Sequence, residues 1–348
     1  MVIKFFNTLS KSKEVFEPIE KDHIKFYVCG PTVYSRPHIG NARSIVIYDL
    51  LYRFLQNKFA KVTYVRNITD VDDKINKAAI ENKVSIKELT SKIIEDFNSD
   101  IEYLNVLKPN FEPKATENIT EIINMIEKLI ANKNAYISEG HVLFDVNSYK
   151  EYGELSRRNL DEMIVGARVE VANYKKNPLD FVLWKPSSKK DDASSVFDSP
   201  WGKGRPGWHI ECSAMSNKFL GQDFDIHGGG ADLQFPHHEN EIAQSKCANI
   251  GSNFSKYWLH NGFLTVSGEK MSKSVGNFIT VADLIEKNIS GIIIRFLLLS
   301  THYRKPLDFT DKSLMDATKS IEKFYSILSK ESFLLSKYEN PYLEKVML

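Results

Sequence analysis

The fold class is decided by the stretch IKFYVCGPTVYSRPHIGNARSIVIYDLLYRFLQNKFAKVTYVRNIT, residues 24–69. Residues 24–30 are mostly apolar and end in glycine, as a buried strand does. Residues 41–56 place apolar side chains at helical spacing, and residues 61–69 alternate between apolar and polar side chains like a second strand. A strand, a helix and a strand in this order predict the opening of a parallel α/β sheet.

A change in pattern near residue 135 indicates an inserted or appended module, of which residues 150–205 are polar and loop-rich, and a second α/β unit follows it. The other elements predicted between residue 85 and the C-terminus are helices over 85–104 and 117–133, a hairpin over 135–148, a helix over 207–221, a strand over 224–230, and helices over 236–248, 280–288, 290–303 and 311–330. Pro236 stands in the first turn of its helix, where proline is tolerated. We therefore predict an α/β fold, with a Rossmann-like parallel sheet that an insertion divides and an α-helical C-terminal segment.

The composition is that of an ordinary globular protein. Of the 348 residues, 42% are hydrophobic and 26% are charged, and the formal net charge is +1. This length suffices for two or more domains, the net charge gives no global signal for nucleic acid, and no apolar run approaches the ~18 residues of a membrane helix. Three widely spaced cysteines argue against a disulfide framework, so we expect a cytoplasmic protein without membrane contact.

Two segments carry the residue types that bind phosphate groups. His38 and Asn41 stand where a predicted helix begins beyond a strand end, and the N-terminus of such a helix suits an anion. Lys270 and Lys273 stand in a glycine-bounded loop, GEKMSKSVGN, from which two ammonium groups could reach a polyphosphate. Each segment also has a plainer interpretation, because a histidine before a helix is often a cap and a lysine-rich loop is often only solvated.

The stretch FPHHENEIAQS, residues 235–245, follows a run of three glycines, Gly228–Gly230, and leaves three interpretations open. It could form a metal site, an acid/base pair or a polar helix end. His237 and Glu241 are four residues apart and therefore share one face of a helix. The glycines could admit a ligand close to the backbone or could form a flexible turn.

Together these segments resemble a known family. HIGN at residues 38–41 resembles the HIGH signature of class I aminoacyl-tRNA synthetases, with Asn41 in place of the last histidine, and KMSKS at residues 270–274 matches the second signature of that class. Further matches, which narrow the resemblance to the cysteinyl-tRNA synthetase family, are YVCGPTVY (27–34), NITDVDDKI (67–75), PGWHIECSAM (206–215) and GGGADLQFPHHENEIAQS (228–245). The resemblance covers roughly residues 3–320.

The resemblance implies a site for each substrate and for a metal ion. The implied catalytic residues are His38, Asn41, Lys270 and Lys273, and the implied ATP-binding residues are Gly40, Gly228, Gly229, Gly230 and Lys273. The implied cysteine-binding residues are Gly30, Thr69, Trp208 and Asp232. One Zn²⁺ per chain would be bound by Cys29, Cys212, His237 and Glu241, and Mg²⁺ would accompany ATP. Without the resemblance, Cys29 and Cys212 would be interpreted as buried small side chains, as we interpret Cys247.

The resemblance also implies a division into five segments. They are residues 1–115 and 206–262 as two halves of the class I catalytic domain, 116–205 as an inserted connective module, 263–310 as the KMSKS loop and stem-contact region, and 311–348 as the start of an incomplete helical anticodon-binding domain. We expect the last helix to expose an apolar face, which predicts poor solubility or association.

The implied activity is an ATP-dependent ligation. L-cysteine and ATP would give cysteinyl-adenylate, and the cysteine would pass to the 3′-terminal ribose of tRNA(Cys), with zinc distinguishing cysteine from serine through the thiolate. We expect a monomer that lacks most of the family's anticodon-binding region. Two alternatives stay open, namely a related ligase that joins cysteine to an amino sugar and a non-enzymatic fragment that binds zinc or tRNA.

Overall fold

A four-stranded parallel sheet forms the centre of the computed structural model, which describes residues 2–157, 172–188, 191–271 and 276–335, the last six of these by their backbone alone. The strand order is β10-β9-β3-β4, and every neighbouring pair is parallel. The strands are β3 (His23–Val28), β4 (Lys61–Arg66), β9 (Phe224–Gly230) and β10 (Ser255–Asn261). Since β3 and β4 precede the insertion and β9 and β10 follow it, the divided parallel sheet is confirmed.

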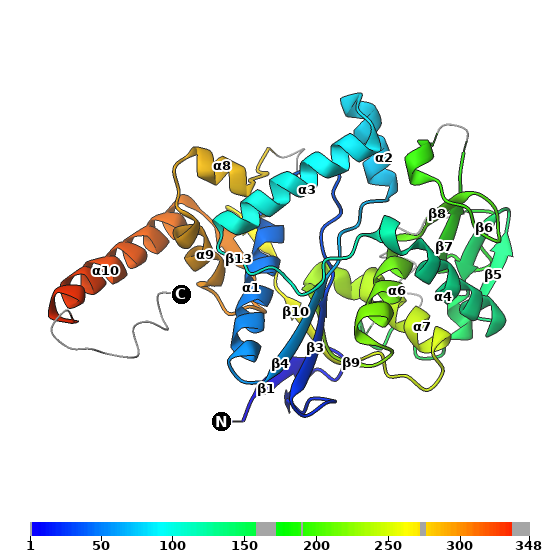
Figure 1. Cartoon of the computed structure of the whole chain (residues 1–348), viewed down its shortest axis with the longest axis horizontal. Helices are drawn as coiled ribbons and strands as arrows, with labels where there is room; N and C mark the ends of the chain where they lie inside the picture. Colours follow the sequence, from blue (N-terminus) through cyan, green and yellow to red (C-terminus); the bar gives the residue numbers. More distant parts are fainter. Residues whose placement is uncertain (1, 158–171, 189–190, 272–275, 336–348) are drawn as a thin grey trace.

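Helices cover both faces of this sheet, because its strands are apolar on both faces. Figure 1 shows α1 (Ile39–Gln56) and α6 (Trp208–Leu220) on opposite sides of the central strands. Successive side chains of a strand point to opposite faces, so Phe26 packs with Tyr48 of α1, whereas Tyr27 packs with Met215 of α6. Cys29, two residues beyond Tyr27, belongs to the cluster on the α6 side.

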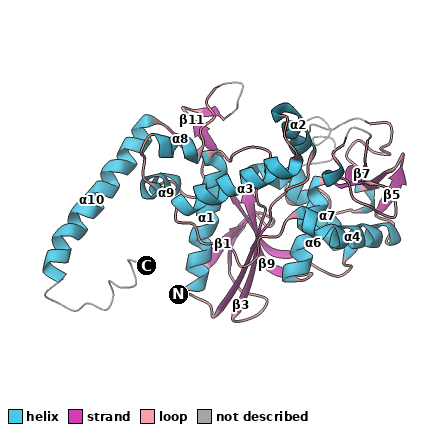
Figure 2. Ribbon diagram, turned by 45° about the horizontal axis from the view of Figure 1, so that its top comes forward, coloured by secondary structure: helices cyan, strands magenta, loops and turns pink. Residues whose placement is uncertain are grey.

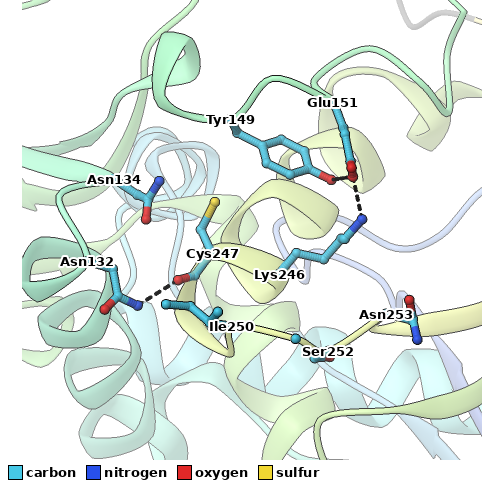
Figure 3. A pocket seen from close by; sticks show the side chains of 10 residues that line it. Asn132, Asn134, Tyr149, Glu151, Lys246, Cys247, Ile250, Ser252 and Asn253 are labelled. Carbon is cyan, nitrogen blue, oxygen red and sulfur yellow. Dashed lines mark hydrogen bonds and ion pairs between the residues drawn. The ribbon is translucent and has the colours of Figure 1, made fainter.

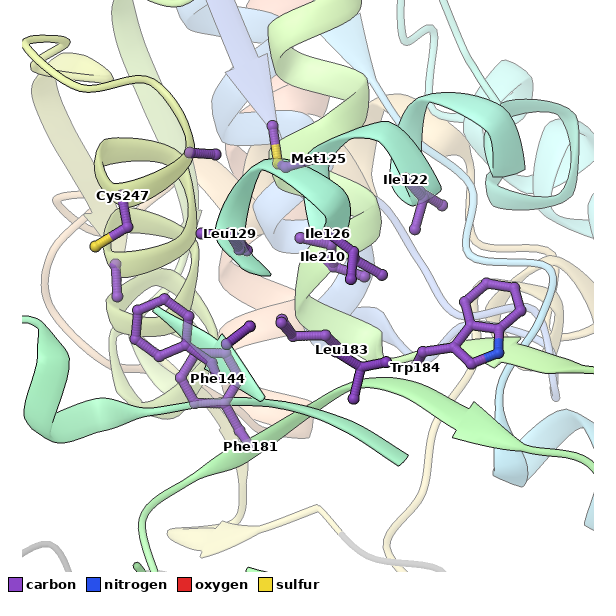
Figure 4. Packing of buried hydrophobic residues seen from close by; sticks show 14 of the residues in the cluster. Ile122, Met125, Ile126, Leu129, Phe144, Phe181, Leu183, Trp184, Ile210 and Cys247 are labelled. Atoms are coloured by element: carbon purple, nitrogen blue, oxygen red, sulfur yellow. The ribbon is translucent and has the colours of Figure 1, made fainter. Parts of the chain in front are cut away.

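The insertion folds into a second sheet, which is antiparallel and has the order β5-β6-β7-β8. Its strands are β5 (Ala135–Ser138), β6 (His141–Phe144), β7 (Phe181–Pro186) and β8 (Gly204–Pro206). The hairpin is confirmed, but residues 150–205 are more regular than their polar composition predicts. Strand β7 reads FVLWKP, which lacks polar alternation and ends in proline, so periodicity alone does not mark it. Figure 4 shows α4 (Ile119–Ala131) packing Ile122 and Ile126 above this sheet.

The C-terminal part is a small three-stranded sheet with helices around it. Its elements are β11 (Leu264–Val266), β12 (Glu269–Lys270), α8 (Val281–Glu286), α9 (Gly291–Leu299), β13 (Leu307–Phe309) and α10 (Asp311–Leu335). Helix α10 extends away from the body (Figure 2), and Phe324, Tyr325 and Leu328 on it are at least half exposed. The predicted helices and their exposed apolar face are therefore present. Among the described residues, no helix is long and apolar enough to cross a membrane.

The remaining elements lie around the central sheet. They are β1 (Lys4–Asn7), β2 (Ser12–Val15), α2 (Asp73–Asn82), α3 (Ile86–Tyr103) and α7 (Glu239–Ala248). The helix predicted from Pro236 is present, and its first residues have helical backbone angles before the regular α-helix α7 begins at Glu239. Residues Gln234–His238 form a π-helical turn in which Phe235 is extended, with φ −142° and ψ 132°. A residue before proline is biased away from helical angles, which explains why Phe235 is extended and why helical angles continue only from Pro236.

Candidate functional site

Two thiols, a carboxylate and an imidazole converge at the carboxyl end of β3. Cys29 directly follows that strand, Cys212 lies on α6, His237 lies in the π-helical turn and Glu241 lies in the first turn of α7. Their ligand atoms all lie within 4.8 Å of one another. Glu241 Oε1 lies 3.0 Å from His237 Nε2 and accepts a hydrogen bond from Cys29 Sγ at 3.3 Å. The four residues that the resemblance implies as metal ligands are thus neighbours in space.

A second group of four shares two of these residues. Cys29 and Glu241 also lie within 4.8 Å of His227 and His238. Glu241 Oε2 is 2.9 Å from His227 Nε2, and Cys29 Sγ is 3.4 Å from His238 Nε2. The second group contains one thiol, whereas the first group adds the thiol of Cys212. Because zinc binds thiolates strongly, the first group is the better match for zinc.

The charges in this cluster favour a cation. Burial and the neighbouring Cys212 raise the pKa of the Cys29 thiol well above its ordinary value. Burial alone would raise the pKa of Cys212 too, but the Cys29 thiol and the His237 ring lower it to about 6. Burial also opposes ionisation of Glu241, yet His227 and His237 hold the pKa of this carboxyl well below its usual range. Burial alone would lower the pKa of His237, but Glu241 and Cys212 raise it to about 10.

These donors fit a zinc ion. Two sulfur atoms, one imidazole nitrogen and one carboxylate oxygen belong to the ligand types that zinc takes in proteins, and four such ligands suit its tetrahedral preference. A divalent cation would neutralise the negative charge that two thiolates and a carboxylate bring together. The buried cluster therefore has the composition of a metal site and not of a polar helix end.

His38 is the N-cap of α1, so the interpretation of this histidine as a helix cap is correct. Its Nδ1 atom accepts hydrogen bonds from the backbone N–H groups of Gly40 at 3.0 Å and Asn41 at 3.2 Å. Asn41 Oδ1 in turn accepts the backbone N–H of His38 at 3.2 Å, which completes a capping box. Burial lowers the pKa of His38, against an opposing effect of Asp232. With Nδ1 occupied as an acceptor, the neutral ring carries its proton on Nε2 and can donate there.

The two predicted phosphate-binding segments are adjacent in space. A Cβ atom added to Gly40 would lie 2.9 Å from the His38 ring and 3.0 Å from Met271 Cε. The ring of Phe278 meets His38 edge-on at 5.2 Å, and the backbone N–H of Ile39 donates to Ile279 O at 2.9 Å. Both ends of the KMSKS loop that the structure describes therefore pack on the first turn of α1, where a side chain at position 40 would displace the His38 ring.

Of the two lysines in this loop, one can be placed. Lys270 lies at the end of β12 with an exposed side chain. Lys273 falls within residues 272–275, which lie outside the described part of the chain. The expected action of both lysines on a polyphosphate stays a prediction.

The implied cysteine-binding residues lie at the carboxyl ends of β3 and β4 and beside the metal cluster. Gly30 donates its backbone N–H to Asn67 Oδ1 at 2.8 Å, and Asn67 Nδ2 donates to Thr69 Oγ1 at 3.2 Å. A Cβ at Gly30 would lie 1.6 Å from Asn67 O, so no other residue fits there. The ring of Trp208 lies 4.3 Å from that of His237, between centroids. Asp232 lies in the turn that follows β9, and its charge opposes the lowering of the His38 pKa.

The glycine run Gly228–Gly230 lies at the end of β9 and is packed from one side by α1. A Cβ at Gly228 would lie 2.4 Å from the ring of Tyr48. The Tyr48 hydroxyl accepts the backbone N–H of Gly229 at 2.6 Å and donates to Leu259 O at 2.6 Å. The run is therefore a fixed strand end and not a flexible turn. A close approach of a ligand to its backbone stays a prediction.

Two residues near the metal cluster, His260 and Thr8, are not among the site residues predicted from the sequence. His260 Nε2 lies 2.8 Å from His238 Nδ1, and His260 Nδ1 lies 2.8 Å from the hydroxyl of Thr8. This chain of contacts fixes the His238 ring whose other nitrogen faces Cys29. Its signal in the sequence would be the position of His260 at the end of β10, an apolar strand parallel to β9.

Cys247 lies apart from this site, in agreement with its interpretation as a buried small side chain. It is 9% exposed and packs in the core of the inserted module, against residues of α4 and β6 (Figure 4). Its other side meets a surface pocket of about 430 Å³, where Asn132 donates to Cys247 O at 2.8 Å and Lys246 pairs with Glu151 (Figure 3). We assign no function to this pocket.

Comparisons with known proteins agree with this geometry. Residues 15–319 match the family model described as tRNA synthetases class I (C) catalytic domain. The chain is 58% identical over 327 residues to the cysteine–tRNA ligase of Wolbachia sp. subsp. Drosophila simulans (strain wRi), a match over 94% of this chain and 72% of that protein. It is 57% identical to the cysteine–tRNA ligase of Rickettsia rickettsii (strain Sheila Smith), over 97% of this chain and 74% of that protein.

A solved structure shows the same fold at low sequence identity. The methionyl-tRNA synthetase of Mycobacterium tuberculosis in complex with methionyl-adenylate superposes with a TM-score of 0.64 over 84% of this chain and 68% of that one, at 17% identity. This likeness bears on the fold alone, and it agrees with the Rossmann-like parallel sheet.

Proposed function

Since this chain belongs to the cysteine–tRNA ligase family of class I tRNA synthetases, we propose that it activates L-cysteine with ATP and transfers the cysteine to tRNA(Cys). The observation that carries the proposal is that the ligand atoms of Cys29, Cys212, His237 and Glu241 lie close together beside Trp208. A set of donors with two thiols suits a metal ion that selects a sulfur-containing substrate.

In the first step, an oxygen of the cysteine carboxylate attacks the α-phosphorus of ATP. A bond from that oxygen to phosphorus forms, the bond between the α-phosphorus and its bridging oxygen breaks, and pyrophosphate leaves. His38 donates from Nε2 to a phosphate oxygen, while the N-terminus of α1 favours negative charge. Lys270 and Lys273 offset the charge that develops on pyrophosphate, a kind of stabilisation worth about 10²–10³ in rate for one donor. The glycine strand end, held by Tyr48, borders the nucleotide, which binds with Mg²⁺.

In the second step, a hydroxyl of the 3′-terminal ribose attacks the carbonyl carbon of cysteinyl-adenylate. An ester bond forms, the anhydride bond from carbon to the phosphate oxygen breaks, AMP leaves and the hydroxyl proton passes to solvent. No side chain acts as a covalent nucleophile, so positioning carries most of the rate.

Discrimination against serine is the reason for the metal cluster. An apolar pocket separates near-isosteric side chains by only about 1–3 kcal/mol. A zinc ion held by Cys29, Cys212, His237 and Glu241 would supply a site that binds a thiolate far better than a hydroxyl. Trp208 packs on His237 and would close the side-chain pocket, and Gly30 and Thr69 would border it. We further propose that the protein acts as a monomer in the cytoplasm, where tRNA is charged.

The test is ATP–pyrophosphate exchange on the purified chain, with the zinc content determined on the same sample. We expect exchange that depends on cysteine, no measurable exchange with serine, and about one zinc per chain. Exchange with both amino acids would contradict selection by the thiol. Full zinc content without any exchange would contradict the activation of cysteine.

A further inference from the structure

A lysine on α2 lies between two aromatic rings at the edge of the candidate cysteine pocket. Lys74 Nζ lies 5.7 Å from the centroid of the Tyr34 ring and 5.7 Å from the centroid of the Trp208 ring. Trp208 in turn lies 4.3 Å from His237, one of the proposed zinc ligands. We refer to Tyr34, Lys74 and Trp208 as the mouth cluster.

The two outer members of the mouth cluster face solvent. Tyr34 is 36% exposed and Lys74 is exposed, whereas Trp208 is half-buried beneath them. The mouth cluster therefore extends from the solvent toward the buried metal cluster and lies on the outer side of the candidate cysteine pocket. A substrate that is already enclosed would not need these two side chains, but one that approaches from outside meets them first.

The backbone that carries the cluster is fixed. Val33, the residue before Tyr34, is buried and donates its backbone N–H to Thr69 O at 3.1 Å. Asp72 caps α2 by accepting the backbone N–H of Lys74 at 2.8 Å. The backbone positions from which the aromatic ring and the lysine side chain extend are thus fixed before any ligand arrives.

The ammonium group of Lys74 has no carboxylate bound to it. Among the described residues, no ion pair includes Lys74, and its neighbour Asp73 is engaged by Lys185 at 2.6 Å and by Arg205 at 2.5 Å. Three residues further along the same helix, Lys77 pairs with Glu81 at 3.8 Å in the ordinary way. Lys74 therefore offers a positive charge beside an exposed ring, and this combination suits a nucleotide, whose base stacks on the ring while its phosphate meets the ammonium.

We infer that the mouth cluster receives the unpaired 3′-terminal nucleotides of tRNA, with a base stacked on Tyr34 and a phosphate beside Lys74. This inference rests on the proposed function and specifies where the acceptor enters. It separates the acceptor from ATP, whose phosphates are assigned to the first turn of α1. Tyr34 and Lys74 then serve only the transfer step.

The experiment compares two reactions in the full chain carrying Tyr34→Ala, Lys74→Ala or the matched control Lys77→Ala. Activation is measured as cysteine-dependent ATP–pyrophosphate exchange, with KM values for ATP and cysteine. Transfer is measured as the single-turnover rate from preformed cysteinyl-adenylate to a transcript of tRNA(Cys), with enzyme in excess. Exchange also reports that each variant is folded.

We expect all three variants to keep exchange within about twofold of the wild type. Loss of a stacked base lowers the transfer rate at subsaturating tRNA by at least about fivefold in Tyr34→Ala. Lys74→Ala also slows transfer and weakens its dependence on salt, because one phosphate contact is lost. Lys77→Ala behaves as the wild type, and Tyr34→Trp restores transfer because it keeps the stacking surface.

Several outcomes would overturn the inference. Unchanged transfer in Tyr34→Ala and Lys74→Ala would do so, and so would a wild type that exchanges but does not transfer to this tRNA. A rise in KM for ATP or cysteine that equals the loss of transfer would assign the cluster to activation instead. A wild type without exchange would be different, because it would remove the proposed function itself and the inference with it.

Discussion

His38 joins two roles in one imidazole ring. Its Nδ1 atom accepts two backbone N–H groups of α1, and this occupation leaves the proton on Nε2 as the donor for phosphate. A capping histidine and a phosphate-binding histidine are therefore not alternatives, because the cap fixes both the orientation and the tautomer of the ring. The same ring touches Phe278, so the orientation also depends on the segment that follows the KMSKS loop.

The two roles of His38 can be separated by substitution. Asparagine is a good N-cap, so His38→Asn keeps the free energy of unfolding, whereas His38→Ala loses about 0.5–2 kcal/mol. Both variants lack a donor at the place of Nε2, and we expect the exchange rate to fall about 10²–10³-fold in both. Urea denaturation and ATP–pyrophosphate exchange measure the two effects. If His38→Asn exchanged at the wild-type rate, the ring would be only a cap.

At the scale of single residues, the sequence predicts site residues that belong to recognisable segments. It does not predict contacts between residues that lie far apart in the chain. Cys29, Cys212, His237 and Glu241 could be singled out because each stands in a stretch that resembles a family signature, and the structure brings their ligand atoms together. The contact of His260 with Thr8 joins positions 252 residues apart, and neither position carries a pattern. Such pairs exist only once the sheet is assembled.

Among the elements, α1 is the one that connects the two phosphate-binding segments. Arg43 on this helix is fully buried and donates from Nη1 to Gly262 O at 2.9 Å and Phe263 O at 2.6 Å, and from Nη2 to Lys305 O at 2.7 Å. These carbonyls precede β11 and β13, the strands at the base of the KMSKS loop. Burial lowers the pKa of Arg43 to about 10, so it stays charged at neutral pH.

Removal of this anchor should loosen the loop from the helix. In Arg43→Met three carbonyls lose a charged donor, and we expect the free energy of unfolding to fall by roughly 3 kcal/mol. Exchange should fall as well, because Met271 no longer rests on Gly40. The matched control is Arg53→Met on the last turn of α1. Asp49 pairs with Arg53 but also with Arg295, so it keeps a partner in this variant, and we expect the free energy of unfolding to fall by less than about 1 kcal/mol. Equal losses in both variants, measured by urea denaturation, would contradict an anchoring role for Arg43.

Elements were predictable where hydrophobic spacing is long and regular, and less so where local geometry intervenes. The helices α1, α3, α4 and α10 follow from apolar periodicity alone. The helix from Pro236 was predicted, but the π-helical geometry of its first turn was not, because apolar spacing does not mark it. Strand β7 was missed because it pairs with β6 and β8 only through the folded insertion.

In the whole molecule, the candidate metal site joins the two halves of the divided sheet. Cys29 belongs to the half before the insertion, whereas Cys212, His237 and Glu241 belong to the half after it. A metal bound only by the folded arrangement stabilises that arrangement by mass action. The division of the chain into five segments stays a proposal, but this link explains why an inserted module need not weaken the sheet.

We therefore expect zinc to contribute to the stability of the whole fold. A strong chelator should lower the thermal unfolding temperature of the zinc-loaded chain by about 5 °C or more. Cys212→Ala should bind less zinc, unfold at the lower temperature and not respond to the chelator, while Cys247→Ala, changed in the core of the inserted module, should keep its zinc and its response. Calorimetry with zinc analysis measures both. A Cys212→Ala protein that kept its zinc would instead favour the second group, in which Cys29 and Glu241 are joined by His227 and His238, and that group would still link the two halves.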